Sequence, residues 1–142
     1  MPDLRLIYVK SVPAFARAHA DAARLFHLAG HEGWIGCPSQ ACADRHVAVL
    51  AYLGAELVGV AAGKPVHSGC WMELLFVARR HRRKGYGGRL TAALMRFAER
   101  IGCAWFSFAR RRRNGMILDR IARDLGIARG RFTYLRRFGA AP

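Results

Sequence analysis

The feature that most constrains this chain is a change of pattern near its middle. Residues 69–78, GCWMELLFVA, form a nearly continuous apolar run, which predicts a strand that is buried on both faces and central in a sheet. The following segment, RRHRRKGYGG (79–88), is first basic and then rich in glycine. From Leu90 apolar residues recur with the helical period, and Gly102 ends the pattern. A strand, a basic glycine loop and an amphipathic helix therefore follow one another directly.

The flanking sequence adds strands and helices on both sides of this unit. Alternating or apolar runs predict further strands, and helical periods that end at a glycine predict further helices. The strands are expected at 4–10, 46–53, 57–64, 103–109 and 130–138, the helices at 13–29 and 117–125, and a long loop at 31–45. Without a repeat or a linker in this order, we expect a single domain over residues 1–142.

Charge is distributed unevenly along the chain. Residues 1–78 carry six Lys/Arg and six Asp/Glu, whereas residues 79–142 carry eighteen basic and three acidic residues and so the whole net charge of +15. Such asymmetry predicts an anionic partner on one side of the molecule. With no apolar run long enough to span a membrane and no leader-like N-terminus, we expect a cytoplasmic protein with reduced cysteines.

The basic glycine loop suits a phosphate group, although a solvated basic turn would look similar. It is not a P-loop, because no Gly-Lys-Ser/Thr follows, and its glycines do not fit the dinucleotide fingerprint. A diphosphate needs several N–H donors that converge on one point, and side chains at Gly85, Gly87 and Gly88 would obstruct this. Charge-assisted contacts from Arg82, Arg83 and Lys84 would add to these donors.

The stretch from Arg82 to Gly88 fits the pattern Q/R-x-x-G-x-G/A, and together with the strand before it and the helix after it the sequence resembles the GNAT superfamily of N-acetyltransferases. The resemblance implies an α/β (α+β) fold with a mixed, mostly antiparallel sheet, flanking helices and splayed central strands. It implies acetyl-CoA (coenzyme A) as cofactor. The cofactor-binding residues that it implies are Phe76, Val77, Ala78, Arg82, Arg83, Lys84, Gly85, Tyr86, Gly87, Gly88 and Asn114.

The catalytic groups are less complete than the cofactor motif. Glu73 is the only carboxylate in the central apolar run, and an uninterrupted period of two puts it on one face with Leu75 and Val77. The resemblance implies that Glu73 is the general base. The alternative is a glutamate that pairs with an arginine or faces water. The family's tyrosine acid would stand at Ile121, which cannot donate a proton, and Tyr86 and Tyr134 do not match its position. Asn114 either contacts the pantetheine arm or caps a helix.

Other groups of residues carry weaker signals. The residues that could bind a metal lack tight Cys-x-x-Cys spacing, so we expect no metal site and interpret them as ordinary loop residues; they are His27, His31, Cys37, Cys42 and His46. Cys103 is expected in the core, and Trp34 and Trp71 either pack there or line an acceptor pocket. The run RRRR (110–113) would hold a ribose phosphate, nucleic acid or an acidic protein, or is simply solvated.

Three functions follow from these observations. The first is transfer of an acetyl group from acetyl-CoA to an unidentified amine, carried by a small molecule or a protein. The second is a catalytically weak protein of the same fold that binds coenzyme A and acts by binding an acidic or host protein, which the missing acid and the concentrated charge favour. The third is nucleic-acid binding through the basic half, for which no base-reading helix is evident.

Overall fold

The computed structural model describes residues 3–10, 24–25, 28, 47–110 and 114–139. Within these ranges it contains a seven-stranded sheet of order β1-β2-β3-β4-β5-β7-β6. The elements are β1 (Leu4–Val9), β2 (Val47–Leu53), β3 (Glu56–Val66), β4 (Gly69–Val77), the 3-10 turn η1 (Arg79–His81), α3 (Tyr86–Arg100), β5 (Trp105–Ala109), α4 (Gly115–Asp124), β6 (Ala128–Arg129) and β7 (Thr133–Arg137). The apolar run at 69–78 thus forms the central strand, as predicted.

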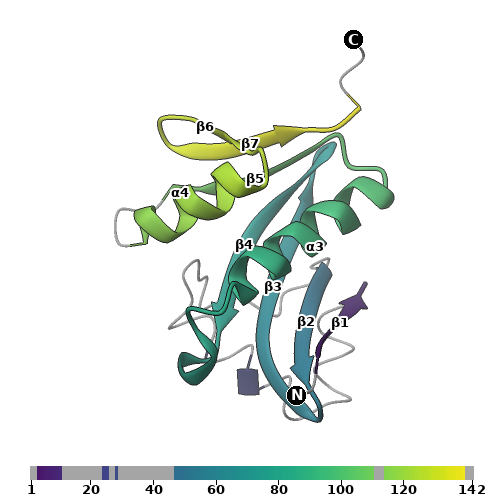
Figure 1. Cartoon of the computed structure of the whole chain (residues 1–142). Helices are drawn as coiled ribbons and strands as arrows, with labels where there is room; N and C mark the ends of the chain where they lie inside the picture. The colour runs from purple at the N-terminus through teal and green to yellow at the C-terminus, as the bar shows by residue number, and fades with distance from the viewer. Residues whose placement is uncertain (1–2, 11–23, 26–27, 29–46, 111–113, 140–142) are drawn as a thin grey trace.

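Two apolar clusters lie on opposite faces of the sheet. The larger contains the buried face of α3, including Leu90, Leu94 and Phe97, together with Leu118 and Ile121 of α4. Figure 1 shows both helices on the same side of the strands. The second cluster contains Leu50, Leu74 and Phe76, with Leu25 packed against it. Burial on both faces explains why β2 and β4 show apolar runs instead of alternation.

The strands are antiparallel neighbours except at the centre of the sheet. β4 and β5 run parallel and are joined by a crossover through α3. Their register has only two pairs, Cys70 with Phe106 and Trp71 with Ser107, although β4 continues to Val77 and β5 to Ala109. The two strands therefore separate beyond Trp71, and the fold is the mixed, mostly antiparallel sheet with splayed central strands that the family resemblance implied.

β4 contains an irregularity that the sequence did not reveal. Ala62 of β3 lies opposite Leu74, whereas Gly63 lies opposite Met72, which leaves Glu73 as an extra residue. Such a bulge shifts the alternation of side chains by one position. Met72 and Leu75 consequently share the α3 face of the sheet. The prediction that Glu73 shares a face with Leu75 and Val77 rested on an uninterrupted alternation, and the bulge removes that basis.

Most predicted elements agree with the structure to within a few residues. The predicted last strand at 130–138 corresponds to β7, whereas the two-residue strand β6 before it and the 3-10 turn at 79–81 were not predicted. The expected helix at 13–29 is described only at its helical residues 24, 25 and 28, and the expected loop at 31–45 lies outside the described residues. No helix in the described part of the chain is long and apolar enough to cross a membrane.

Candidate anion-binding site at the start of α3

The start of α3 presents backbone donors without a side-chain cap. Gly85 occupies the N-cap position, and the first helical bond runs from the Arg89 N–H to the Gly85 carbonyl, at 3.2 Å. The N–H groups of Tyr86, Gly87 and Gly88 therefore have no partner within the helix. No acidic residue stands in the first turn. The positive end of the helix dipole thus remains available to an anion.

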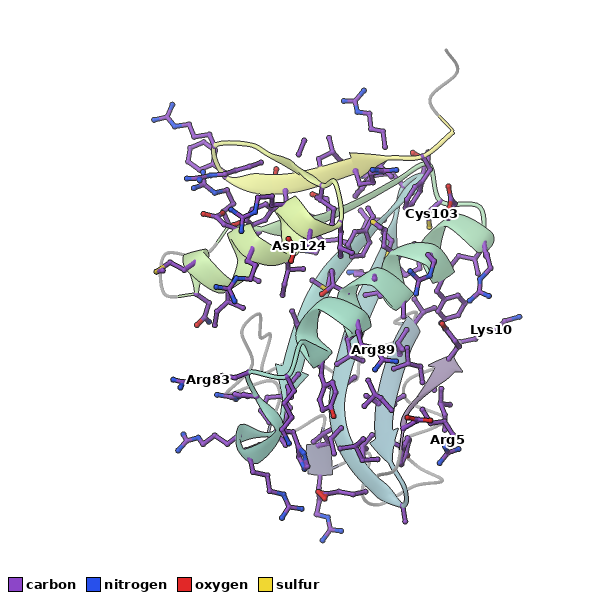
Figure 2. All side chains as sticks on the ribbon, in the orientation of Figure 1. Arg5, Lys10, Arg83, Arg89, Cys103 and Asp124 are labelled. Atoms are coloured by element: carbon purple, nitrogen blue, oxygen red, sulfur yellow. The ribbon has the colours of Figure 1, made fainter. Side chains whose placement is uncertain are left out.

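The loop before α3 and the first turn of the helix leave open space beside two glycines. Its backbone turns through left-handed conformations at Arg83 (φ 64°) and Gly85 (φ 80°). A Cβ built on Gly85 or on Gly88 would meet no heavy atom within 4 Å. Arg83, Lys84 and Arg89 are exposed, and Figure 2 shows Arg83 projecting outward from the loop. The start of α3 thus combines unpaired backbone donors with exposed cations, and binding of a diphosphate there remains a prediction.

The side chain of Arg82 contacts the protein, unlike the exposed side chains of Arg83 and Lys84. Its Nε donates a hydrogen bond to the Val77 carbonyl at 2.8 Å, and its guanidinium lies 5.6 Å from the centre of the Phe76 ring. The side chain is therefore half-buried and joins the loop to the end of β4. Sequence reasoning had grouped Arg82 with Arg83 and Lys84 as three equivalent phosphate contacts, whereas the structure gives Arg82 this additional bond.

The end of β4 has one backbone edge facing β3 and the other facing the side from which β5 has separated. The Ala78 N–H donates to the Val58 carbonyl at 2.8 Å, on the β3 side. Since successive residues of a strand point their peptide groups to opposite edges, the Val77 N–H faces the separated side. Of the predicted pantetheine contacts, the Ala78 N–H and the Val77 carbonyl are thus engaged within the protein.

A charged cluster that sequence reasoning missed holds the first part of the loop. Arg80 forms an ion pair and hydrogen bonds with the Glu56 carboxylate, and the His81 Nε2 lies 3.0 Å from Glu56 Oε2. Hydrogen bonds from Arg80 and then from His81 lower the pKa of Glu56. The buried His81 Nδ1 has no hydrogen-bond partner in the described structure. The start of β3 is therefore tied to η1, far from it in sequence.

Glu73, the predicted general base, lies where the central strands part. It is half-buried and follows the last pair of β4 with β5 by two positions, at the bulge. A bulge re-aims the side chain of the extra residue and is common beside active sites. This position is compatible with a catalytic group, and the base role remains a prediction.

No tyrosine stands at the position of the missing acid. Ile121 is buried in the main core. Tyr134 donates a hydrogen bond to Asp119 of α4, and its pKa is raised by burial and by this bond. Tyr134 thereby links β7 to α4. Tyr86 begins α3 and packs against the main core.

Asn114 occupies the N-cap position of α4. Its backbone carbonyl accepts the Leu118 N–H at 3.0 Å, but its side chain makes no capping hydrogen bond. Asn114 therefore takes part in the start of α4 through its backbone carbonyl, and its side-chain amide does not cap the helix. Contact of that amide with a pantetheine arm remains a prediction.

The two described cysteines are not activated thiols. Cys70 is buried, and desolvation raises its pKa to about 12. Desolvation also raises the pKa of Cys103, which packs against the main core, as expected. No cluster of metal-ligating side chains is found in the parts of the chain that the structure describes. Several predicted groups lie outside those parts, namely His27, His31, Trp34, Cys37, Cys42, His46 and 111–113.

Fold and site together define a protein that can hold an anionic group at an uncapped helix start, beside parallel strands that separate. The family model described as the Acetyltransferase (GNAT) family matches residues 13–116, and the chain belongs to this family. No curated protein matches the sequence significantly.

Solved structures show the same fold at low sequence identity. An acetyltransferase from Bacillus subtilis in complex with CoA is 13% identical, with a TM-score of 0.71 and coverage of 96% of this chain and 99% of the other. The ribosomal-protein-S18-alanine N-acetyltransferase of Escherichia coli is 13% identical, with a TM-score of 0.72 and coverage of 99% of this chain and 97% of the other. The IAA acetyltransferase of Bacillus cereus is 11% identical, with a TM-score of 0.73 and coverage of 96% of this chain and 100% of the other.

Proposed function

We propose that the protein is an acyl-CoA-dependent N-acetyltransferase that transfers an acetyl group from acetyl-CoA to an amine. The observation that carries this proposal is the uncapped start of α3, which opens beside the separated strands β4 and β5. Family membership supports it. A structural neighbour crystallised with CoA supports the choice of cofactor.

Each part of the site has a defined task in this proposal. The N–H groups of Tyr86, Gly87 and Gly88 bind the diphosphate, and the exposed Arg83 and Lys84 neutralise it. Arg82 holds the loop to the end of β4 through the Val77 carbonyl. The Val77 N–H, which faces the separated side of β4, donates to the pantetheine arm or to the thioester oxygen. Acetyl-CoA supplies the activated acyl group.

The proton transfers are assigned to few groups. Glu73, at the bulge, accepts the proton of the attacking amine directly or through a water molecule. Since Ile121 replaces the usual acid, the leaving thiolate is stabilised by the positive surroundings rather than protonated by a tyrosine. A neutral or anionic amine is the preferred acceptor, because the chain has only nine Asp/Glu for a net charge of +15 and cannot readily build an acidic pocket.

Isothermal titration with acetyl-CoA tests the cofactor site. The double variant Arg83→Gln/Lys84→Gln removes two exposed cations without touching the core, so we expect about tenfold weaker binding and a smaller loss of affinity with added salt. Gly87→Trp should abolish binding. The matched control is Arg96→Gln/Lys64→Gln, which removes one exposed arginine and one exposed lysine elsewhere. Wild-type affinity in both site variants would contradict the proposed site.

Activity is tested separately from binding. Mass spectrometry of the purified protein for bound acyl-CoA identifies the cofactor and its acyl length. Glu73→Gln should retain acetyl-CoA binding and lose transfer, with a change in the pH profile of kcat/KM. Tight binding without transfer to any of a panel of neutral, anionic and peptide amines would favour the alternative of a partner-binding protein.

A further inference from the structure

Two apolar side chains are far more exposed than any other large apolar residue in the described parts of the chain. Met116, in the first turn of α4, is 89% exposed, and Phe132, in the turn between β6 and β7, is 70% exposed. Ile117, beside Met116, is 39% exposed. A single exposed apolar side chain is common on a protein surface, but a group of them marks an interaction site.

The structure brings these residues to one end of the molecule. Arg129 of β6 pairs with Asp119 of α4 at 3.2 Å, which fastens the hairpin to the helix. Met116 precedes Asp119 by three positions and so lies on the same side of α4. Phe132 follows Arg129 by three positions, in the turn of that hairpin. Figure 1 shows β6 and β7 running alongside α4.

The turn that carries Phe132 is held in place. Arg110, at the end of β5, donates hydrogen bonds to the carbonyls of Gly130, at 2.7 Å, and Arg131, at 3.0 Å. The N–H of Arg110 also donates to the Phe132 carbonyl, at 2.9 Å. The Arg131 guanidinium lies 5.1 Å from the centre of the Phe132 ring. Phe132 is therefore presented by an ordered backbone, which lowers the entropic cost of binding.

The charge around these side chains is positive. Arg120, four positions after Met116 on the same side of α4, is exposed, and so are Arg129 and Arg131 of the hairpin. The nearby carboxylate of Asp119 is engaged by Arg129 and by the Tyr134 hydroxyl. The surface therefore offers apolar side chains with exposed guanidinium groups at their rim, of which Arg129 is paired with Asp119 and Arg131 lies against the Phe132 ring.

We propose that this surface, formed by Met116, Ile117, Arg120, Arg129, Arg131 and Phe132 and here named the α4–hairpin patch, docks an acidic protein segment that carries apolar side chains. Charge complementarity selects an acidic occupant, because residues 79–142 contain eighteen basic and three acidic residues. Met, Phe and Arg are also the residue types enriched in protein interfaces.

Protein is favoured over nucleic acid as the occupant. Phe132 alone would suit a base, since an aromatic ring stacks on nucleobases. Met116 and Ile117 are aliphatic, and they offer a base neither a flat ring nor a hydrogen bond. They do fit leucine or phenylalanine side chains from another polypeptide. The inference goes beyond the acetyl transfer proposed above and stands without it.

Fluorescence anisotropy with three labelled probes tests this inference on the full chain. The first is a short peptide that alternates glutamate with leucine and phenylalanine, the second has serine in place of the apolar residues at equal charge, and the third is a short DNA duplex. We expect the apolar acidic peptide to bind about tenfold more tightly than the serine peptide. Met116→Ser/Phe132→Ser should remove that preference, because both side chains are exposed and their loss does not disturb the core.

A matched control and a charge variant complete the experiment. Ile101→Ser/Tyr8→Ser removes two exposed apolar side chains elsewhere, 42% and 41% exposed, and should keep the preference. Arg120→Gln/Arg131→Gln should weaken both peptides, and more strongly at low salt. Equal binding of the two peptides by the wild type, tighter binding of the DNA duplex than of the apolar peptide, or an unchanged preference in Met116→Ser/Phe132→Ser would overturn the proposal.

Discussion

The sheet is continuously paired on one side of β4 and barely paired on the other, and the chain before and after this junction differs in charge. β3 and β4 are paired from Gly59 with Val77 to Val66 with Gly69, whereas β4 and β5 are paired only at Cys70 and Trp71. Residues 1–78 are electrically balanced, and residues 79–142 carry the whole +15. The well-paired half therefore provides a rigid frame, while the second half presents donors and cations where the pairing stops. Separation of the strands creates the opening that a sheet of continuous pairing would not have.

The largest expected effect concerns the short junction between the halves. A Cβ on Gly69 would lie 2.0 Å from the ring of Trp105, at the start of β5. Gly69→Ala should therefore lower the free energy of unfolding by about 1–3 kcal/mol, as overpacking does. Chemical denaturation measures this change.

A double-mutant cycle identifies the cause of that loss. In a Trp105→Ala background the ring is gone, and the methyl group of Gly69→Ala should cost almost nothing. An equal cost in both backgrounds would mean that the junction does not depend on the contact between Gly69 and Trp105.

A smaller effect is expected at the loop that opens beside the junction. An added Cβ meets no atom at Gly85 or at Gly88, but only Gly85 has a positive φ. Gly85→Ala should therefore cost about 1–2 kcal/mol of stability and weaken acetyl-CoA binding, because a left-handed backbone is strained with a side chain. Gly88→Ala, which lies within α3, should cause no loss of stability. Thermal unfolding compares the two, and equal Tm values would show that the loop relaxes without strain.

The smallest effect concerns the cluster that ties the loop to the well-paired half. The folded pKa of Glu56 lies below its ordinary value of 4.5, so its contribution to stability is present above that value and is lost as the pH falls through the folded pKa. Glu56→Gln should be slightly less stable than the wild type at neutral pH. The difference should disappear under more acidic conditions, once the carboxylate is protonated.

Thermal unfolding of both proteins across this pH range measures the effect. A difference in stability that does not change with pH would show that the Glu56 charge contributes nothing. Glu99→Gln is a suitable control, since Glu99 is an exposed carboxylate on α3.

Much of the fold was readable from local pattern. The apolar run at 69–78 predicted the central strand, and the period after Leu90 predicted α3, because burial on two faces and on one face leaves different periodicities. The motif from Arg82 to Gly88 predicted the loop and its family, since close approach to a phosphate restricts which residues can stand there. These features depend on neighbours in sequence.

Other features of the site depend on residues that are distant in sequence. No pattern marks Glu56 as the partner of Arg80 and His81, because their contact exists only when β3 lies beside β4. The bulge at Glu73 arises from the register of two strands, and that register is a property of the pair. Arg82 looks like its basic neighbours until the end of β4 offers it the Val77 carbonyl.

The sequence by itself determined which segments are strands, helices and glycine turns, where the positive charge is concentrated, and the family. Only the tertiary structure decided where β4 and β5 part, which cations remain exposed and that Met116 and Phe132 lie at one end of the molecule. The physical reason is that periodicity and backbone preference act between neighbours in the chain. Strand register, side-chain pairing and solvent exposure are set by contacts between segments that only folding brings together.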